Sequence, residues 1–173
     1  MATYNEWMNS KIYDAAGTLS VEDLAKDRGG FFRSILGTLN HIMVGDVAWL
    51  RRFATHPADY RALHPVLDFP QPTSLDQILF ADFAELSMHR KMLDTAISKW
   101  SKTITDRDLE HVLIYKRMSG DECRKDFCGV VMHFFNHQVH HRGQITTMLT
   151  QAGLDVGATD LIMLIPDEMA AHE

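Results

Sequence analysis

The sequence predicts an all-α protein in which four long amphipathic helices form a bundle within one domain, residues 1–173. Three observations predict this class. Four stretches carry apolar residues at the three-and-four spacing of a helix. Only one short region has the composition of β-strands. The chain of 173 residues is 46% hydrophobic, which is sufficient for a core of ordinary size without disulfide bonds.

The first quarter of the chain predicts one long helix followed by a short one. An apolar stripe at helical spacing runs from about Thr3 to Leu19. Ser20 and the acidic residues that follow it predict a short extra turn, which we expect Gly29-Gly30 to end.

The second long helix is expected from residues 32–34 to about Ala54. The segment after it, residues 55–73, contains four of the five prolines, so it predicts a long and mostly irregular connection. Because such a connection can cross the bundle, the helices need not alternate strictly up and down.

The third helix has the clearest predicted start. Ser74-Leu75-Asp76-Gln77 matches a capping box, in which Ser74 and Gln77 satisfy each other's backbone donors. Apolar residues at helical spacing continue from there to about Lys102.

The apolar period changes between residues 106 and 127. Residues 111–115 are rich in β-branched and aromatic side chains, and residues 119–121 form a turn signal, so we expect a small β-hairpin. The fourth helix is expected over residues 126–151, and Gly153 is placed to end it. The tail contains another apolar run, which packs either on its own bundle or on a partner subunit.

Composition and charge exclude several classes of partner. The formal net charge is −6, and the 17 basic residues are scattered among 23 acidic ones. Nucleic acids and anionic lipids are bound through clustered Lys and Arg, so we expect neither as a partner. No segment approaches the roughly 18 apolar residues of a membrane span. Cys123 and Cys128 fit no disulfide framework or Cys-x-x-Cys motif, and the N-terminus lacks a secretion signal, which together indicate a cytoplasmic protein.

The histidines point to a metal site. Positions four apart lie on one helix face with Cβ atoms about 5–6 Å apart, so His137 and His141 can direct two imidazoles at one point. His133 lies one turn earlier, and His140 is a competing partner whose direction differs from that of His141 by about 100°.

A third ligand has to come from another element. The best candidate is His41, in the middle of the second predicted helix. Gly37 and Gly45 lie one turn on either side of it, and a glycine inside a helix costs about 1 kcal/mol relative to alanine. The two glycines indicate that a neighbouring helix or a small ligand needs room there. A lone histidine is more often a surface or hydrogen-bonded core residue, which is how we interpret the histidines outside this group: His56, His64, His89, His111 and His172.

Two segments of the chain carry a recognisable pattern. Residues 135–144 read Phe-Asn-His-Gln-Val-His-His-Arg-Gly-Gln, and residues 37–53 read Gly-Thr-Leu-Asn-His-Ile-Met-Val-Gly-Asp-Val-Ala-Trp-Leu-Arg-Arg-Phe. With these segments the chain strongly resembles the DinB family of metalloproteins, and in particular its DNA-damage-inducible branch. The resemblance covers nearly the whole chain, including the hairpin before the last helix.

The resemblance implies a four-helix bundle in up-down-down-up order, often dimeric, with a divalent metal ion, usually zinc or nickel, on three histidines. By motif, His41 matches the ligand on the second helix, and His137 and His141 match the pair on the fourth. The family name records induction by DNA damage and does not imply that the protein binds DNA. The expected partners are a second copy of the chain and a small-molecule substrate or thiol.

Three imidazoles leave at least one coordination position of a metal open, which is typical of a catalytic site. Some members of the family use bacillithiol, mycothiol or glutathione, so the preferred hypothesis is a metal-dependent enzyme that activates a small thiol for transfer to an electrophile. Two alternatives stay open. One is a metal-binding stress protein or sensor without catalysis, and the other is a metal-dependent hydrolase with His133 or His140 as its base.

Other side chains near these motifs receive supporting roles. Gln144, three residues after His141, is expected to contact a ligand or the second nitrogen of a metal-binding imidazole. Asp46 points away from His41, so a structural pairing with an arginine is the favoured interpretation over general-base chemistry. Asn40 and Asn136 are expected to cap or pack, and Trp49 to lie in the core.

Overall fold

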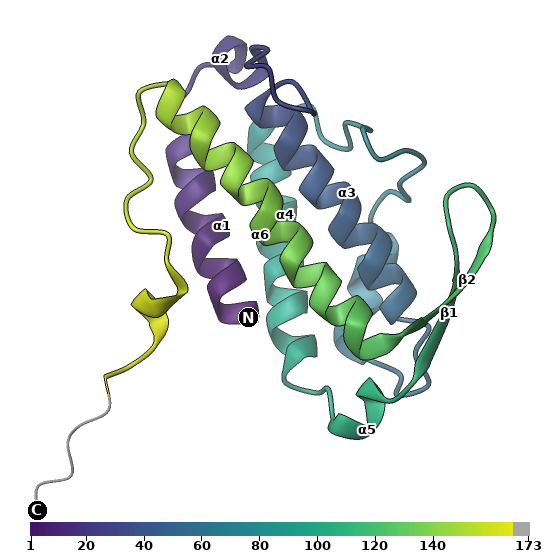
Figure 1. The fold of residues 1–173 in the computed structure, drawn as a ribbon. Helices are drawn as coiled ribbons and strands as arrows, with labels where there is room; N and C mark the ends of the chain where they lie inside the picture. The colour runs from purple at the N-terminus through teal and green to yellow at the C-terminus, as the bar shows by residue number, and fades with distance from the viewer. Residues whose placement is uncertain (168–173) are drawn as a thin grey trace, which may run out of the picture.

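The computed structural model describes residues 1–167, which are mostly helical with one small antiparallel hairpin (Figure 1). This confirms the predicted helical class. Four long helices make up most of the described chain: α1 (Ala2–Ala16), α3 (Ile35–Phe53), α4 (Phe83–Ser101) and α6 (Phe127–Gln151).

The long helices pack against one another in pairs. Helix α1 lies against α4 and α6, and α3 lies against the same two helices. In Figure 1, α1 and α6 run toward the end of the molecule that carries α2 (Val21–Ala25), whereas α3 and α4 run away from it. The long connection between α3 and α4 therefore returns the chain to the end where α3 began.

An aromatic cluster fills the core at the end of the molecule where α3 and α4 end. The ring of Phe53 stacks on Trp100 at 5.1 Å between centroids and meets Phe127 and Phe134 edge-on at 5.3 and 5.6 Å. All four side chains are fully buried. This contact joins α3, α4 and α6, and it sets how far apart these helices lie.

A buried polar network links the four long helices. Asp46 on α3 pairs with Arg90 on α4 at 2.5 Å and accepts a hydrogen bond from Gln138 on α6 at 2.8 Å. Arg90 also pairs with Asp94, at 3.0 Å, and Arg142 donates to Asn5 of α1. The predicted pairing of Asp46 with an arginine is confirmed. Buried charges require such partners.

The helix ends follow ordinary capping chemistry where the sequence signal is local. Ser20 accepts a hydrogen bond from the backbone of Asp23 and begins α2, as predicted, although α2 ends at Ala25, before Gly29-Gly30. Ser34 caps α3 by accepting from the backbone of Gly37, at the predicted start.

The predicted start of the third helix at Ser74 is wrong. Helix α4 begins at Phe83, where the Asp82 side chain accepts from the backbone of Glu85 at 2.8 Å. The Gln77 side chain instead accepts from the backbone of Thr73 at 2.8 Å. The connection before it is also more regular than predicted, since it contains a 3₁₀ helix, η1 (Arg61–Asp68).

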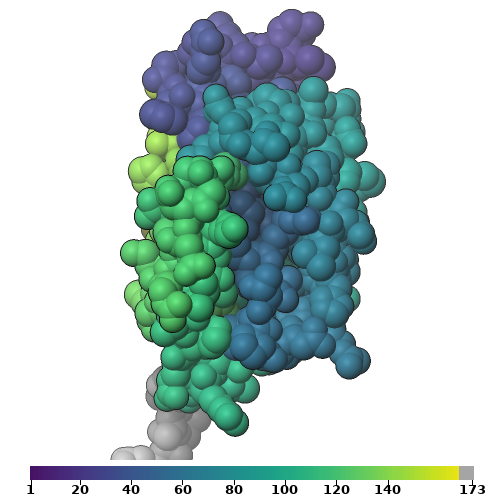
Figure 2. All heavy atoms as spheres, turned by 90° about the vertical axis from the view of Figure 1, so that its right-hand side faces the viewer, coloured from purple at the N-terminus to yellow at the C-terminus, as the bar shows by residue number. Residues whose placement is uncertain are grey.

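The hairpin forms where the change of period predicts it. Strand β1 (Val112–Lys116) pairs antiparallel with β2 (Glu122–Asp126), and Gly120 in the turn has φ +93°. A short helix, α5 (Asp106–Leu109), precedes it. Figure 2 shows the molecule hollowed between this hairpin and the segments that follow α3.

Helix α6 begins and ends as predicted, with Gly153 in a left-handed conformation at φ +83° just after it. Beyond it, a short 3₁₀ turn, η2 (Leu161–Leu164), leaves its apolar side chains largely exposed, 66% in the case of Ile162. The apolar run of the tail is therefore not buried against the helices of its own chain. None of the helices in residues 1–167 is both long and apolar enough to cross a membrane.

Candidate metal centre

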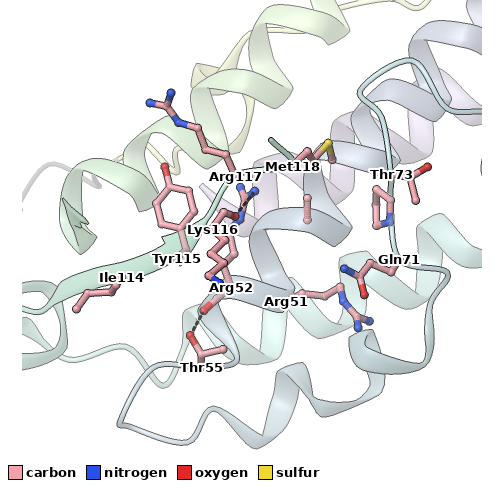
Figure 3. A pocket seen from close by; sticks show the side chains of 12 residues that line it. Arg51, Arg52, Thr55, Gln71, Thr73, Ile114, Tyr115, Lys116, Arg117 and Met118 are labelled. Atoms are coloured by element: carbon pink, nitrogen blue, oxygen red, sulfur yellow. Dashed lines mark hydrogen bonds between the residues drawn. The ribbon is translucent and has the colours of Figure 1, made fainter. Parts of the chain in front are cut away.

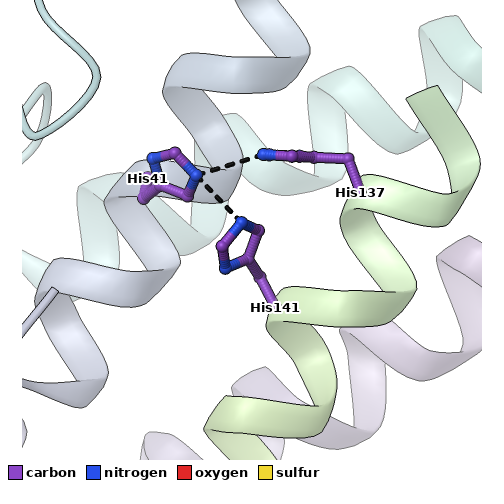
Figure 4. A group of neighbouring side chains, drawn as sticks. All are labelled: His41, His137 and His141. Atoms are coloured by element: carbon purple, nitrogen blue, oxygen red, sulfur yellow. Dashed lines mark hydrogen bonds between the residues drawn. The ribbon is translucent and has the colours of Figure 1, made fainter. Parts of the chain in front are cut away.

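Helices α3 and α6 bring three imidazole rings together. His41 lies in the middle of α3, and His137 and His141 lie one turn apart on the facing side of α6 (Figure 4). The Nε2 atom of His41 is 3.1 Å from the Nε2 atoms of both other rings. Within the described residues, this is the one group of three or more His, Cys, Asp or Glu residues whose potential ligand atoms converge, all within 4.8 Å.

Two of these rings are oriented through their other nitrogen. Nδ1 of His41 lies 2.7 Å from the carbonyl oxygen of Leu75, and Nδ1 of His141 lies 2.8 Å from Oε1 of Gln144. A carbonyl oxygen can only accept, so in each ring Nδ1 carries the proton and Nε2 carries a lone pair. The predicted role of Gln144, contact with an imidazole nitrogen, is confirmed.

Burial keeps the three rings neutral. It lowers the pKa of His41 and His141, and it lowers the pKa of His137 to about 3, with the neighbouring imidazoles adding to the shift. Neutral rings at 3.1 Å place two Nε2 lone pairs, those of His41 and His141, toward each other with no proton between them. A cation at the centre of the group removes this repulsion, so the donor set fits a divalent metal ion.

Gly45 makes room for His137. A Cβ atom at Gly45 would lie 2.8 Å from Cε1 of His137, closer than real Cβ atoms approach. Helix α3 therefore carries a glycine here because an imidazole from the neighbouring helix α6 occupies the space. This is the first of the two explanations predicted from the sequence, a closely packed neighbouring helix. Gly37 has a different reason, because a Cβ atom there would meet the backbone carbonyl of Phe32, at 2.3 Å.

Asn40 holds the segment that orients His41. Its side chain donates to the carbonyl oxygen of Phe80 and accepts from the backbone nitrogen of Phe80, both at 3.0 Å. This pair of bonds fixes the segment before α4 against α3, and the same segment presents the Leu75 carbonyl to His41. Asn40 is therefore a packing residue, as predicted, and the bonds explain why residues 74–82 do not continue α4 toward the N-terminus.

Phe32 covers one side of the group. Its ring stacks on His41 at 3.7 Å between centroids, with an interplanar angle of 16°, and meets His141 edge-on at 5.6 Å. The loop that places it includes Gly29, with φ +75°, and Arg33, which adopts φ +65°. The position of Phe32 could not be predicted from the sequence, because a loop residue that precedes a helix has no periodic signal.

His133 and His140 lie beside the group without joining it. The ring of His133 is 5.9 Å from that of His137 and packs edge-on against Trp49 at 5.5 Å. His140 lies 3.3 Å from Nε2 of Gln144. Trp49 itself is only half-buried, against Tyr115, so its predicted place in the core is correct only in part.

Most of the other histidines have ordinary partners, as expected. Those partners are the backbone of Ala58 and Asp108 for His56, the carboxylate of Asp59 for His64, the backbone of Glu85 for His89 and the ring of His56 for His111. His172 lies outside the described residues.

Comparison with known proteins identifies the family of the chain. The sequence pattern of the DinB family matches residues 1–169. The chain is also 26% identical over 158 residues to "Protein DinB" of Bacillus subtilis (strain 168), an alignment that covers 91% of this chain and 87% of that protein. No solved structure matches the chain. The chain belongs to the DinB family.

Proposed function

We propose that His41, His137 and His141 bind one divalent metal ion through their Nε2 atoms. One observation carries the proposal: the three Nε2 atoms converge while hydrogen bonds to Leu75 and Gln144 hold the Nδ1 protons of two rings on the far side. Metal-binding imidazoles commonly have this second hydrogen bond, which fixes the tautomer and the ring direction. Zinc and nickel are the metals proposed, since imidazole suits both.

We propose that the metal site serves a small-molecule reaction. Three protein ligands leave at least one position open, where a bound metal ion would lower the pKa of a thiol or water and so raise its reactivity near neutral pH. The chain's own residues orient the ligands, through Leu75 and Gln144, and exclude water from one side of His41, through Phe32.

The nucleophile is proposed to be a low-molecular-weight thiol. Cys123 lies on β2 and Cys128 lies in the first turn of α6, more than two turns before His137. Neither belongs to the group of converging ligand atoms. A thiol at the open position would therefore come from solution, and its transfer to an electrophile is the favoured reaction.

Two alternatives differ from this in measurable ways. A metal-binding stress protein or sensor would hold the ion without turnover. A metal-dependent hydrolase would need a base, and His133, whose exposed ring lies 5.9 Å from that of His137, is the residue best placed for it. A His133→Ala variant would lose hydrolysis but would keep thiol transfer.

Three further features are proposed on the resemblance and on the packing. The paired contacts of α1 and α3 with α4 and α6 support a four-helix bundle in up-down-down-up order. A homodimer and a cytoplasmic location are proposed from the sequence, and light scattering of the purified protein tests the dimer.

Metal analysis tests the site. The protein is purified without a metal-binding tag, incubated with zinc or nickel and desalted. One ion per chain is expected, falling to well below one in His41→Ala and His141→Ala. His64→Ala is the matched control, because its exposed ring lies outside the metal group and pairs with the carboxylate of Asp59. Full stoichiometry in either ligand variant would contradict the assignment.

Thiol consumption by the metal-loaded protein, with glutathione or bacillithiol and a model electrophile, then distinguishes an enzyme from a metal sensor.

A further inference from the structure

A groove beside the hairpin forms a concave site separate from the histidine group. It lies between β1, the segment of residues 71–73 and the last two turns of α3, and it has a volume of about 490 Å³. Figure 2 shows α3 at the bottom of this hollow, and Figure 3 shows the lining side chains. Pockets of about 300–1,000 Å³ hold small molecules in other proteins.

The lining is strongly basic in an acidic chain. Arg51, Arg52, Lys116 and Arg117 line the groove, together with neutral residues and no carboxylate. Within residues 1–167, none of these four side chains forms an ion pair with a carboxylate. The chain as a whole carries a net charge of −6. Four cations without acidic partners at one concave surface produce a local positive potential.

Arg52 is held in place before any ligand arrives. Its guanidinium lies 4.6 Å from the centroids of both Trp49 and Tyr115, and one nitrogen donates to the Lys116 carbonyl oxygen at 3.3 Å. A guanidinium has five N–H donors, so this bond leaves further donors for a ligand. An arginine fixed in this way binds an anion with little loss of side-chain entropy.

The other basic side chains differ in mobility. Arg51 is anchored, because one of its terminal nitrogens donates to the carbonyl oxygen of Leu67 at 2.7 Å. Lys116 and Arg117 are exposed at the rim, and in Figure 3 the Arg117 side chain extends away from the groove. Lys116 and Arg117 are therefore free to turn toward a ligand, whereas Arg51 and Arg52 are already fixed in the groove.

We propose that this groove binds a small molecule that carries two or more carboxylate or phosphate groups. The size of the cavity favours a small molecule over a nucleic acid, and the net charge of −6 agrees, because it disfavours binding of a polyanion along the rest of the molecule. The inference does not depend on metal binding.

The groove adjoins the histidine group along α3. Ala48, which lines the groove, follows His41 by seven residues in α3, or nearly two full turns. The two residues therefore lie on the same face of the helix, about 10 Å apart along its axis. His137 occupies the position between them, over Gly45. A ligand in the groove would therefore lie next to the proposed metal centre.

Calorimetric titration with citrate and with pyrophosphate tests the site. The protein is used metal-free, because both probes chelate metal ions, and at low ionic strength, because salt screens such contacts. We expect at least one probe to bind with a dissociation constant below about 1 mM. Binding of citrate alone would identify carboxylates as the ligand groups, and binding of pyrophosphate alone would identify phosphates.

Variants locate the binding. Arg52→Gln combined with Lys116→Gln should weaken it roughly tenfold or more. Lys99→Gln, a matched loss of charge on the exposed face of α4, should leave it unchanged. Because Arg52 also packs on two rings, Lys116→Gln with Arg117→Gln provides a second pair of exposed changes, and a several-fold loss is expected. The proposal is overturned if neither probe binds, or if the groove variants bind as well as Lys99→Gln.

Discussion

The Nδ1 atom of His41 donates a hydrogen bond to the carbonyl oxygen of Leu75, 34 residues further along the chain, at 2.7 Å. The matching bond of His141 is local, because Gln144 lies one turn later on the same helix. The two rings are thus oriented by different means. The backbone acceptor of His41 cannot be removed by substitution, whereas the acceptor of His141 is a side chain and can be tested directly.

We therefore predict that Gln144→Ala weakens metal affinity without abolishing binding. Loss of a hydrogen bond that orients a metal ligand typically costs about 10–100-fold in affinity. Gln144→Glu keeps an acceptor for Nδ1 and should retain affinity close to that of the original protein. Competition with a chromophoric chelator measures the dissociation constants, with Gln151→Ala at the end of α6 as the control. Equal affinities for Gln144→Ala and the control would contradict this role.

Gly45→Ala should damage the metal site although alanine favours a helix. The new Cβ atom would lie 2.8 Å from Cε1 of His137, so the ring has to move out of the group. We expect at least a tenfold loss of metal affinity, in line with the effect of misplaced ligands.

Gly143→Ala is the matched control for that substitution. It lies in α6, and a Cβ atom there would meet no other atom within 4 Å. The change should keep metal affinity and raise the free energy of unfolding by up to about 1 kcal/mol. Urea denaturation and chelator competition on both variants give the comparison. If Gly45→Ala bound metal as tightly as Gly143→Ala, the close packing of His137 over α3 would be wrong.

The metal-free protein should lose stability as the pH falls below about 6.5. Burial lowers the pKa of His137 to about 3, whereas the unfolded chain has an ordinary value near 6.5. Between these values the unfolded state binds the additional proton, so acidification favours unfolding, by at most about 1.4 kcal/mol per pH unit and by less for a partly exposed ring.

A neutral substitution isolates this effect. Burial raises the pKa of Asp46 to about 6. Below that pH the folded state binds the proton on Asp46 more readily than the unfolded state does, so this group makes the protein more stable as the pH falls, which opposes the effect of His137. The informative quantity is therefore the difference in the free energy of unfolding between the original protein and His137→Gln. Urea denaturation in the presence of a chelator measures it at pH 7.5, 6.0 and 5.0. The stability difference should shift in favour of His137→Gln as the pH falls. A difference independent of pH would show that His137 is not the buried neutral ring described.

The sequence could predict the parts of the site that depend on spacing within one helix. His137 and His141 follow from their four-residue separation, and Gln144 follows from its place one turn later. The convergence of His41 with them required the resemblance, because periodicity does not say which helices face each other. Their role as metal ligands stays a prediction.

The parts of the site and the fold that the sequence could not predict depend on backbone hydrogen-bonding groups and on contacts between residues far apart in the sequence. The Leu75 carbonyl has no side-chain signature, and Phe32 lies in a loop. The capping pattern at Ser74 predicted the wrong start for the third long helix, because the hydrogen bonds between Asn40 and Phe80, 40 residues apart, outweighed this local signal. A true capping box occurs instead at Thr105 and Asp108, at the start of the short helix α5.

Asp46→Ala should destabilise the fold while the metal site keeps its full stoichiometry. Asp46 is fully buried and accepts hydrogen bonds from Arg90 and Gln138. Its removal leaves the buried Arg90 guanidinium with one carboxylate partner, Asp94, within residues 1–167. Removing one partner of a buried ion pair typically costs about 3–5 kcal/mol, which in a domain of this size lowers the melting temperature by about 10 °C. Asp14→Ala, on the exposed face of α1, should change stability by less than about 0.5 kcal/mol. Thermal melts and metal analysis at a temperature where both variants are folded separate the two roles. A stable Asp46→Ala variant with lost metal or lost turnover would instead make Asp46 part of the chemistry.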